Sequence, residues 1–125
     1  MTQQAAAAYR RNAILTASPG KLVKMLYDAA LANLDKAHRE VSDAATRRGA
    51  AAGEAISKSY AIVGELRAAL DFEVGGKIAR DLDALYDYCL EQITAANAAR
   101  EPQGLDNARR VLRTLKEAWD VVLTG

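Results

Sequence analysis

The side chains that could take part in catalysis are few and isolated. The sequence has one histidine, His38, and one cysteine, Cys89. His38 lies in Ala37-His38-Arg39-Glu40, with no following lysine to steady a phosphoryl group and no nearby glycine to admit a partner protein. A solvated helical histidine is therefore the favoured interpretation. The alternative is a phosphoacceptor in a four-helix, histidine phosphotransfer-like signalling module.

Cys89 and the acidic residues indicate structure more than catalysis. Cys89 falls on an apolar stripe, where cysteine is usually a small buried hydrophobe, and a single cysteine cannot form an internal disulfide, as is typical of a reducing compartment. Asp81 and Asp83 are expected in the first turn of a helix, where the macrodipole favours negative charge. There is no Cys/His set for zinc and no Glu-x-x-His spacing for a di-iron site. The sequence predicts no enzyme, no metal and no cofactor.

The charge balance argues against nucleic acid as a partner. The chain has 17 basic and 16 acidic residues, whereas a nucleic-acid binder needs a clustered positive surface. The basic residues within 109–116 are expected to form a solvated helix face, with an acidic partner as the alternative. No apolar run approaches the roughly 18 residues that span a membrane, and residues 1–8 lack the pattern of a secretory signal. The sequence predicts a soluble, cytoplasmic protein.

The apolar residues of this chain recur with a helical period. Ser18-Pro19 marks a helix start, because serine caps helix N-termini and proline is accepted at the first helical position. From there apolar residues recur every three or four positions over about 24 residues, and the same period returns in three later stretches. The stripes are Leu22 or Val23, Leu26, Ala30, Leu34, Ala37 and Val41; Ile56, Tyr60, Val63, Leu66 and Leu70; Ile78, Leu82, Leu85, Cys89, Ile93 and Ala96; Leu105, Ala108, Leu112, Leu115, Trp119 and Val122.

Glycine-rich segments separate these stretches. The region 47–53 is expected to hold the first turn, Val74-Gly75-Gly76 is expected to end the second helix, and 97–104 is either a turn or the start of the last helix. Four helices with short connections favour an all-α, up-down-up-down four-helix bundle. The bundle is expected over residues 18–125. Residues 1–17 carry too few apolar side chains for a full helix face and form an N-terminal arm or a loose tail.

Apolar residues outside the main stripes indicate a partner. Met25, Leu31, Ile62 and Leu90 lie beside or off the stripes, and a bundle that exposes such groups presents a patch of the kind that usually binds another molecule. Five of the seven aromatic residues are tyrosines. Tyrosine suits a surface that opens and closes, because its ring can be buried while its hydroxyl reaches water or a partner.

Five short motifs follow one another in a fixed order. They are Thr16-Ala-Ser-Pro-Gly-Lys-Leu-Val-Lys-Met-Leu-Tyr-Asp28, Leu70-Asp-Phe-Glu-Val-Gly-Gly-Lys-Ile-Ala79, Leu85-Tyr86-Asp87-Tyr88, Ala95-Ala96-Asn97 and Ala118-Trp119. Together they resemble the flagellar export chaperone family FliS, whose N-terminal tyrosine is matched by Tyr9. The resemblance runs from Tyr9 to Trp119. Ala29 and Cys89 depart from the pattern, which often has Gly and Met there, but both keep a small or apolar side chain.

The resemblance implies a cytoplasmic chaperone that binds the disordered C-terminal segment of flagellin. Masking that segment would prevent premature polymerisation and keep flagellin unfolded for delivery to the flagellar type III export apparatus. The family also meets the export gate protein FlhA and, in some bacteria, connects with the flagellin regulator FliW. In the family the client wraps around the bundle, and the N-terminal arm occupies part of the same groove when no client is present.

A client-binding groove is expected near Ser18-Pro19, where the first motif and the off-stripe apolar residues coincide. An amphipathic client helix in such a groove is an established recognition mode, and self-association into a homodimer through the same apolar surface is the alternative. The predicted lining is Leu22, Met25 and Leu26 from the first helix, Leu66 and Leu70 from the second, and Leu82 and Tyr86 from the third, capped by Tyr9, Ile14 and Leu15 of the arm.

Overall fold

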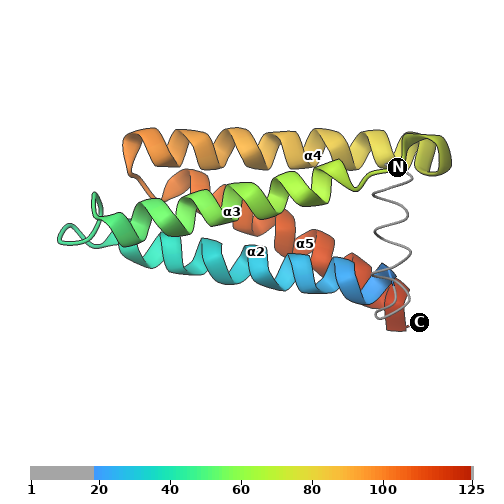
Figure 1. Ribbon diagram of the computed structural model, residues 1–125, viewed down its shortest axis with the longest axis horizontal. Helices are drawn as coiled ribbons and strands as arrows, with labels where there is room; N and C mark the ends of the chain where they lie inside the picture. The colour runs from blue at the N-terminus through green and yellow to red at the C-terminus, as the bar shows by residue number, and fades with distance from the viewer. Residues whose placement is uncertain (1–18, 125) are drawn as a thin grey trace.

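The described part of the chain, residues 19–124, forms four α-helices in the computed structural model. They are α2 (Pro19–Ser42), α3 (Ala50–Ala68), α4 (Phe72–Ala99) and α5 (Gln103–Thr124). Consecutive helices run in opposite directions (Figure 1), and each contacts two others: α2 and α4 both pack against α3 and α5. The predicted all-α, up-down-up-down four-helix bundle is therefore confirmed. The predicted arm, residues 1–17, lies outside the described residues.

α2 begins and ends as its sequence pattern predicts. The helix spans 24 residues from Pro19, and its stripe side chains Ala30, Leu34, Ala37 and Val41 are fully buried. Tyr27, which the predicted stripe did not include, is fully buried beside them. They meet Ile56 of α3, Ile93 of α4 and Leu112 of α5 in one core. Burial of this continuous stripe is what stabilises the helix, because packing of an apolar face outweighs intrinsic propensity.

The predicted end of the second helix at Val74-Gly75-Gly76 is wrong. α3 ends at Ala68, and the double glycine lies inside α4, whose backbone leaves the helical path at Gly76. The reason is a cap that precedes the glycines: Asp71 Oδ1 accepts hydrogen bonds from the backbone N–H groups of Glu73 and Val74, both at 3.1 Å. This cap starts a new helical turn, so the glycines mark a break within α4 and not the end of α3.

The predicted place of Asp81 and Asp83 in a first helical turn is also wrong, because α4 begins at Phe72. Asp81 Oδ2 lies 2.8 Å from Lys77 Nζ, and Asp83 Oδ1 lies 2.7 Å from Arg67 Nε of α3. A second nitrogen of Arg67 lies 3.1 Å from Asp87 Oδ1. These carboxylates thus pair with cations beyond the helix N-terminus, and two of them join α3 to α4.

The connection between α4 and α5 is tight. α4 ends at Ala99 and α5 begins at Gln103, so the region 97–104 contains the end of α4, a short turn and the start of α5. A Cβ atom on Gly104 would lie 2.3 Å from the carbonyl oxygen of Gln92. Only glycine allows the two backbones to come this close.

Candidate functional site

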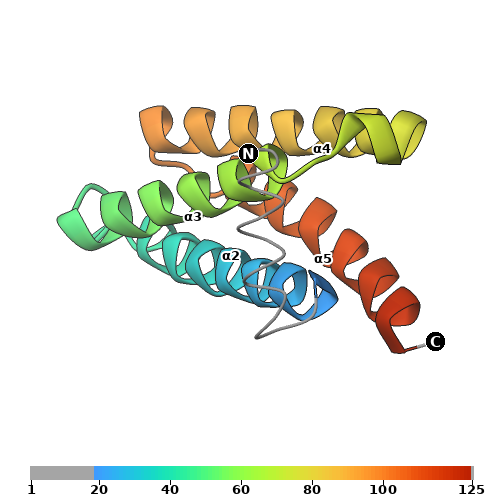
Figure 2. The same ribbon diagram turned by 45° about the vertical axis from the view of Figure 1, so that its right-hand side comes forward.

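An apolar groove of about 650 Å³ is formed by all four helices. It lies at the end of the bundle where α2 and α4 begin and where α3 and α5 end. Figure 2 shows α5 running obliquely to α4, so that the end of α5 and the start of α4 diverge there. The groove lies at this end, and its lining side chains come from all four helices.

The groove contains six of the residues that the sequence predicted for client binding. Five of these residues lie in helices and one in a turn. They are Leu22 and Leu26 of α2, Leu66 of α3, Leu70 of the turn after α3, and Leu82 and Tyr86 of α4. Met25 is not among the lining residues, and its side chain is 54% exposed. Tyr9, Ile14, Leu15 and Ser18 lie outside the described residues, as does the side chain of Pro19.

The structure adds apolar side chains that the sequence analysis did not include in the site. Val23, Val74, Ile78, Ala79 and Trp119 also line the groove. Val74 and Ile78 stand out because they are 85% and 71% exposed, although β-branched apolar side chains are normally among the most buried. The signal for both was present in the motif 70–79. It was missed because the double glycine was assigned to a turn between helices.

The floor of the groove is held by a hydrogen-bonded aromatic cluster. Tyr27 Oη and Tyr86 Oη are 2.5 Å apart, and Trp119 Nε1 donates to Tyr27 Oη at 3.3 Å. The two tyrosine rings lie 6.5 Å apart between centroids. Burial raises the pKa of both hydroxyls, so they stay neutral hydrogen-bonding groups. The cluster ties α2, α4 and α5 together beneath the groove.

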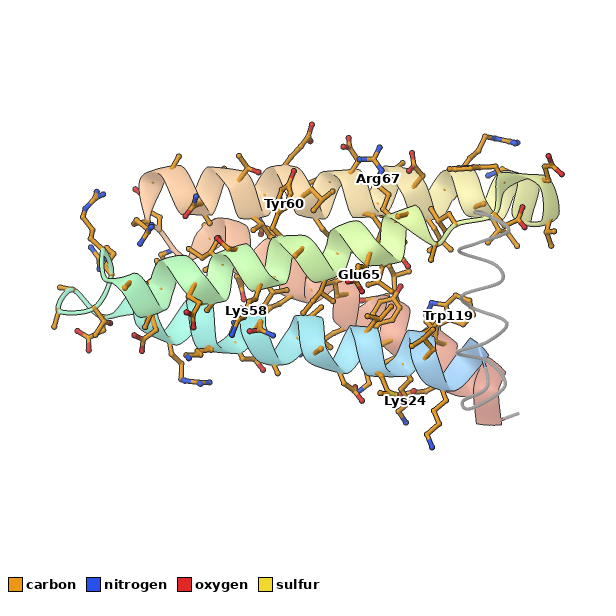
Figure 3. All side chains as sticks on the ribbon, in the orientation of Figure 1. Lys24, Lys58, Tyr60, Glu65, Arg67 and Trp119 are labelled. Atoms are coloured by element: carbon orange, nitrogen blue, oxygen red, sulfur yellow. The ribbon has the colours of Figure 1, made fainter. Side chains whose placement is uncertain are left out.

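Few of the residues that line the groove are charged. Glu65 and Asp71 are the acidic residues among its lining, and Asp71 is engaged in capping α4. Lys24 Nζ lies 3.7 Å from Asp120 Oδ1, which links the first turns of α2 to the end of α5. Figure 3 shows Trp119 between the starts of α2 and α4, while Lys24 extends away from the bundle. The groove therefore offers a mostly apolar surface, with two carboxylates among its lining residues.

The expectation that the basic residues of α5 form a solvated face holds only for Arg110 and Arg113, whose side chains are 67% and 55% exposed. The side chain of Arg109 is only 16% exposed, and its guanidinium lies 2.9 Å from both Asp35 of α2 and Asp106. Arg109 holds the pKa of Asp106 below its usual range through this hydrogen bond. Lys116 Nζ lies 2.7 Å from Asp28 of α2. These cations are matched within the molecule, so they fasten α5 to α2.

His38 and Cys89 lie apart from the groove. His38 is half-buried beside this ionic network, and burial together with Arg109 lowers its pKa. Cys89 is fully buried, and burial raises its pKa to about 12, so it is a neutral thiol near pH 7. Within residues 19–124, no group of three or more His, Cys, Asp or Glu side chains is arranged to hold a metal ion.

Comparison with known proteins identifies the family of this chain. The family model described as flagellar protein FliS matches residues 1–124. The chain belongs to the FliS family. Among its FliS relatives, the flagellar secretion chaperone FliS of Vibrio cholerae is 40% identical over 108 residues, which are 85% of this chain and 76% of that protein.

Two further FliS relatives extend the similarity. The flagellar secretion chaperone FliS of Salmonella typhimurium is 36% identical over 111 residues, covering 86% of this chain and 78% of that protein. The flagellar secretion chaperone FliSB of Pseudomonas aeruginosa is 33% identical over 105 residues, covering 83% and 80%. The resemblance carried by the five motifs is thus confirmed. Among the described helices, none has the length and hydropathy to cross a membrane.

Proposed function

We propose that this protein is a cytoplasmic export chaperone that binds the disordered C-terminal segment of flagellin. Binding would keep flagellin from polymerising early and deliver it to the flagellar type III export apparatus. The observation that carries the proposal is the exposed apolar groove on a member of the FliS family. The protein acts by binding and not by catalysis, because the groove lining offers apolar contact and no nucleophile beside a base.

The chemistry of the groove supports a helical apolar client. Its lining comes from side chains spaced along four helices, and it lies open at Val74 and Ile78. An amphipathic client helix places residues at i, i+3, i+4 and i+7 on one face, which suits an apolar groove. Folding of a disordered segment on binding typically buries about 1,000–3,000 Å², enough for micromolar or tighter affinity after the cost of ordering.

The proposed client-binding residues are the six that meet in the groove together with Met25 and the N-terminal positions. Tyr9, Ile14 and Leu15 would belong to an arm, residues 1–17, that caps the bundle domain of residues 18–125, and Ser18-Pro19 would join the two. A tethered arm competes at an effective concentration near millimolar. It would therefore mask the groove and still yield to a client that buries more apolar area.

The proposal extends to further partners through the family resemblance. The chaperone–flagellin complex would meet the export gate protein FlhA, and the flagellin regulator FliW would be a partner in organisms that use it. Self-association of the client-free protein into a homodimer is the competing use of the same apolar groove.

Calorimetric titration with the last roughly 50 residues of the same organism's flagellin tests the proposal. We expect saturable one-to-one binding with a negative heat-capacity change, because apolar surface is buried. A peptide of the same composition in scrambled order is the control. Absence of heat at high micromolar peptide, with the bundle folded, would overturn the proposal. Self-association unaffected by the peptide would favour the homodimer.

A further inference from the structure

α4 breaks at Gly76, about one turn after it begins. Gly76 has φ 52° and ψ −123°, a conformation that is strained for an L residue with a side chain and readily adopted by glycine. A Cβ atom placed on Gly76 would meet no atom within 4 Å. The requirement for glycine here thus comes from the backbone conformation and not from a lack of space.

The residues before the break form a small unit with its own hydrogen bonds. We call residues 71–75 the capped turn. Asp71 caps it through the N–H groups of Glu73 and Val74, and the Asp71 carbonyl accepts a hydrogen bond from the Gly75 N–H at 2.8 Å. Because these bonds are local, the capped turn can take a direction different from the rest of α4. Figure 1 shows it curling at the start of α4.

The capped turn and the segment after the break carry apolar side chains that the bundle leaves uncovered. Val74 and Ile78 are mostly exposed on the two sides of Gly76, and both line the groove. Further along the same helix, Ile93 is fully buried. The strongest exposure of apolar side chains on α4 thus lies around the break, which is also the part that borders the groove.

We propose that Gly76 is a positioning residue for client binding. The break that it permits directs the capped turn so that Val74 and Ile78 together form one wall of the groove, and the apolar face of the flagellin segment covers both side chains. This inference rests on the proposed function. The double glycine thereby shapes the binding surface, which it would not do if it only formed a turn between two helices.

Two glycine-to-alanine variants test this role by the dissociation constant of the flagellin C-terminal peptide. Gly76→Ala should weaken binding about tenfold, the change expected when one valine-sized side chain loses its apolar contact. Gly64→Ala is the matched control, because Gly64 lies inside α3, outside the groove lining, and a Cβ atom added there would meet no atom within 4 Å. It should leave the dissociation constant unchanged within twofold.

A mirror-image residue separates backbone conformation from side-chain size. Gly76→D-Ala, made by ligation of synthetic segments, has the same added methyl group as Gly76→Ala but favours positive φ. It should bind the peptide as the wild type does. Val74→Ser, which keeps the backbone and removes the apolar contact, should weaken binding about tenfold. Circular dichroism and thermal unfolding of every variant report whether the bundle is folded.

The outcomes are distinct. Gly76→Ala with unchanged affinity would overturn the inference, and so would Gly76→D-Ala that folds but binds about tenfold more weakly. If Gly76→Ala unfolds, the dissociation constants of Gly76→D-Ala and Val74→Ser, each compared with that of the wild type, still test the inference. Failure of the wild type itself to bind the peptide would overturn the proposed function, which is a different result from equal binding by wild type and variant.

Discussion

The two ends of the bundle differ in how they are closed. At the end where α2 and α4 terminate, Gly104 lets α5 approach the backbone of α4, and Arg100 Nη1 donates to the carbonyl oxygens of Arg47 and Gly49 at 3.2 and 3.5 Å. At the opposite end, α4 and α5 diverge around the groove, and Val74 and Ile78 stay exposed. We call these the closed end and the open end.

The difference shows how one small bundle can combine a stable fold with an uncovered apolar surface. The closed end and the middle bury most of the stripe residues of the four helices, although Tyr60 and Leu85 are 46% and 38% exposed. This supplies most of the apolar burial that stabilises a domain. The open end leaves part of that burial unmade. A client that covers the groove would bury this remaining apolar surface. The surface that folding leaves exposed is therefore available for binding.

The largest expected effect lies at the closed end. Gly104→Ala would place a methyl group 2.3 Å from the Gln92 carbonyl oxygen, and the two helices would have to move apart. We expect a loss of about 3 kcal/mol in the free energy of unfolding, the upper part of the range for overpacking. Urea denaturation measures it, with Gly64→Ala as control. A loss under about 0.5 kcal/mol would show that the closed end is not tightly packed.

A charge at the open end should affect binding and leave folding nearly unchanged. Ile78→Asp puts a carboxylate on a mostly exposed wall of the groove, where an apolar client would have to desolvate it. We expect peptide affinity to fall about 50-fold, or about 2.3 kcal/mol. Ala84→Asp adds the same charge at an exposed position of α4 outside the groove lining. Equal losses in the two variants would refute the assignment of the groove.

The aromatic cluster beneath the groove should show an intermediate effect on stability. Tyr27→Phe removes the hydroxyl that pairs with Tyr86 and accepts from Trp119, and it leaves one buried and one partly buried polar group without that partner. The expected loss is about 1.5 kcal/mol in the free energy of unfolding. Tyr60→Phe, at a half-exposed position, should change stability by less than about 0.5 kcal/mol. If Tyr27→Phe lowers the free energy of unfolding by no more than Tyr60→Phe does, the aromatic cluster does not stabilise the open end.

The smallest expected effect is a pH dependence at His38. Because burial lowers the folded-state pKa of His38, the unfolded chain binds a proton more readily below its ordinary pKa of about 6.5. Stability should therefore decline slightly as the pH falls from about 7 toward about 5, and His38→Gln should flatten that decline. Parallel urea titrations at several pH values measure both slopes. An unchanged slope in the variant would assign the dependence to other groups.

The sequence predicts the helices and the main stripes well, because a repeat of three and four residues reports directly which face of a helix is apolar. It does not report how deeply each apolar residue is buried. Leu66 and Ile78 lie on similar stripes, yet Leu66 is 4% exposed and Ile78 is mostly exposed. That difference depends on the divergence of α4 and α5, which arises from the packing of all four helices and has no local sequence signal.

The errors in the site have similar physical causes. A double glycine is usually a stop, and only the Asp71 cap shows that a new helix has already begun. The basic residues of α5 have the spacing of a solvated face. Their partners Asp28 and Asp35 lie on α2, far away along the chain, and Arg109 and Asp35 are separated by 74 positions in sequence. Pairing over such a separation depends on the fold and cannot be inferred from spacing.

Trp119 makes the intrinsic fluorescence of the protein sensitive to the state of the groove. It is the single tryptophan of the chain, it lines the groove, and its indole N–H is hydrogen-bonded to Tyr27. Tryptophan fluorescence therefore arises from this one residue and reports on the polarity at the groove floor. An occupant that displaces water there would shift the emission toward shorter wavelengths, which gives the protein a built-in reporter of occupancy without any attached dye.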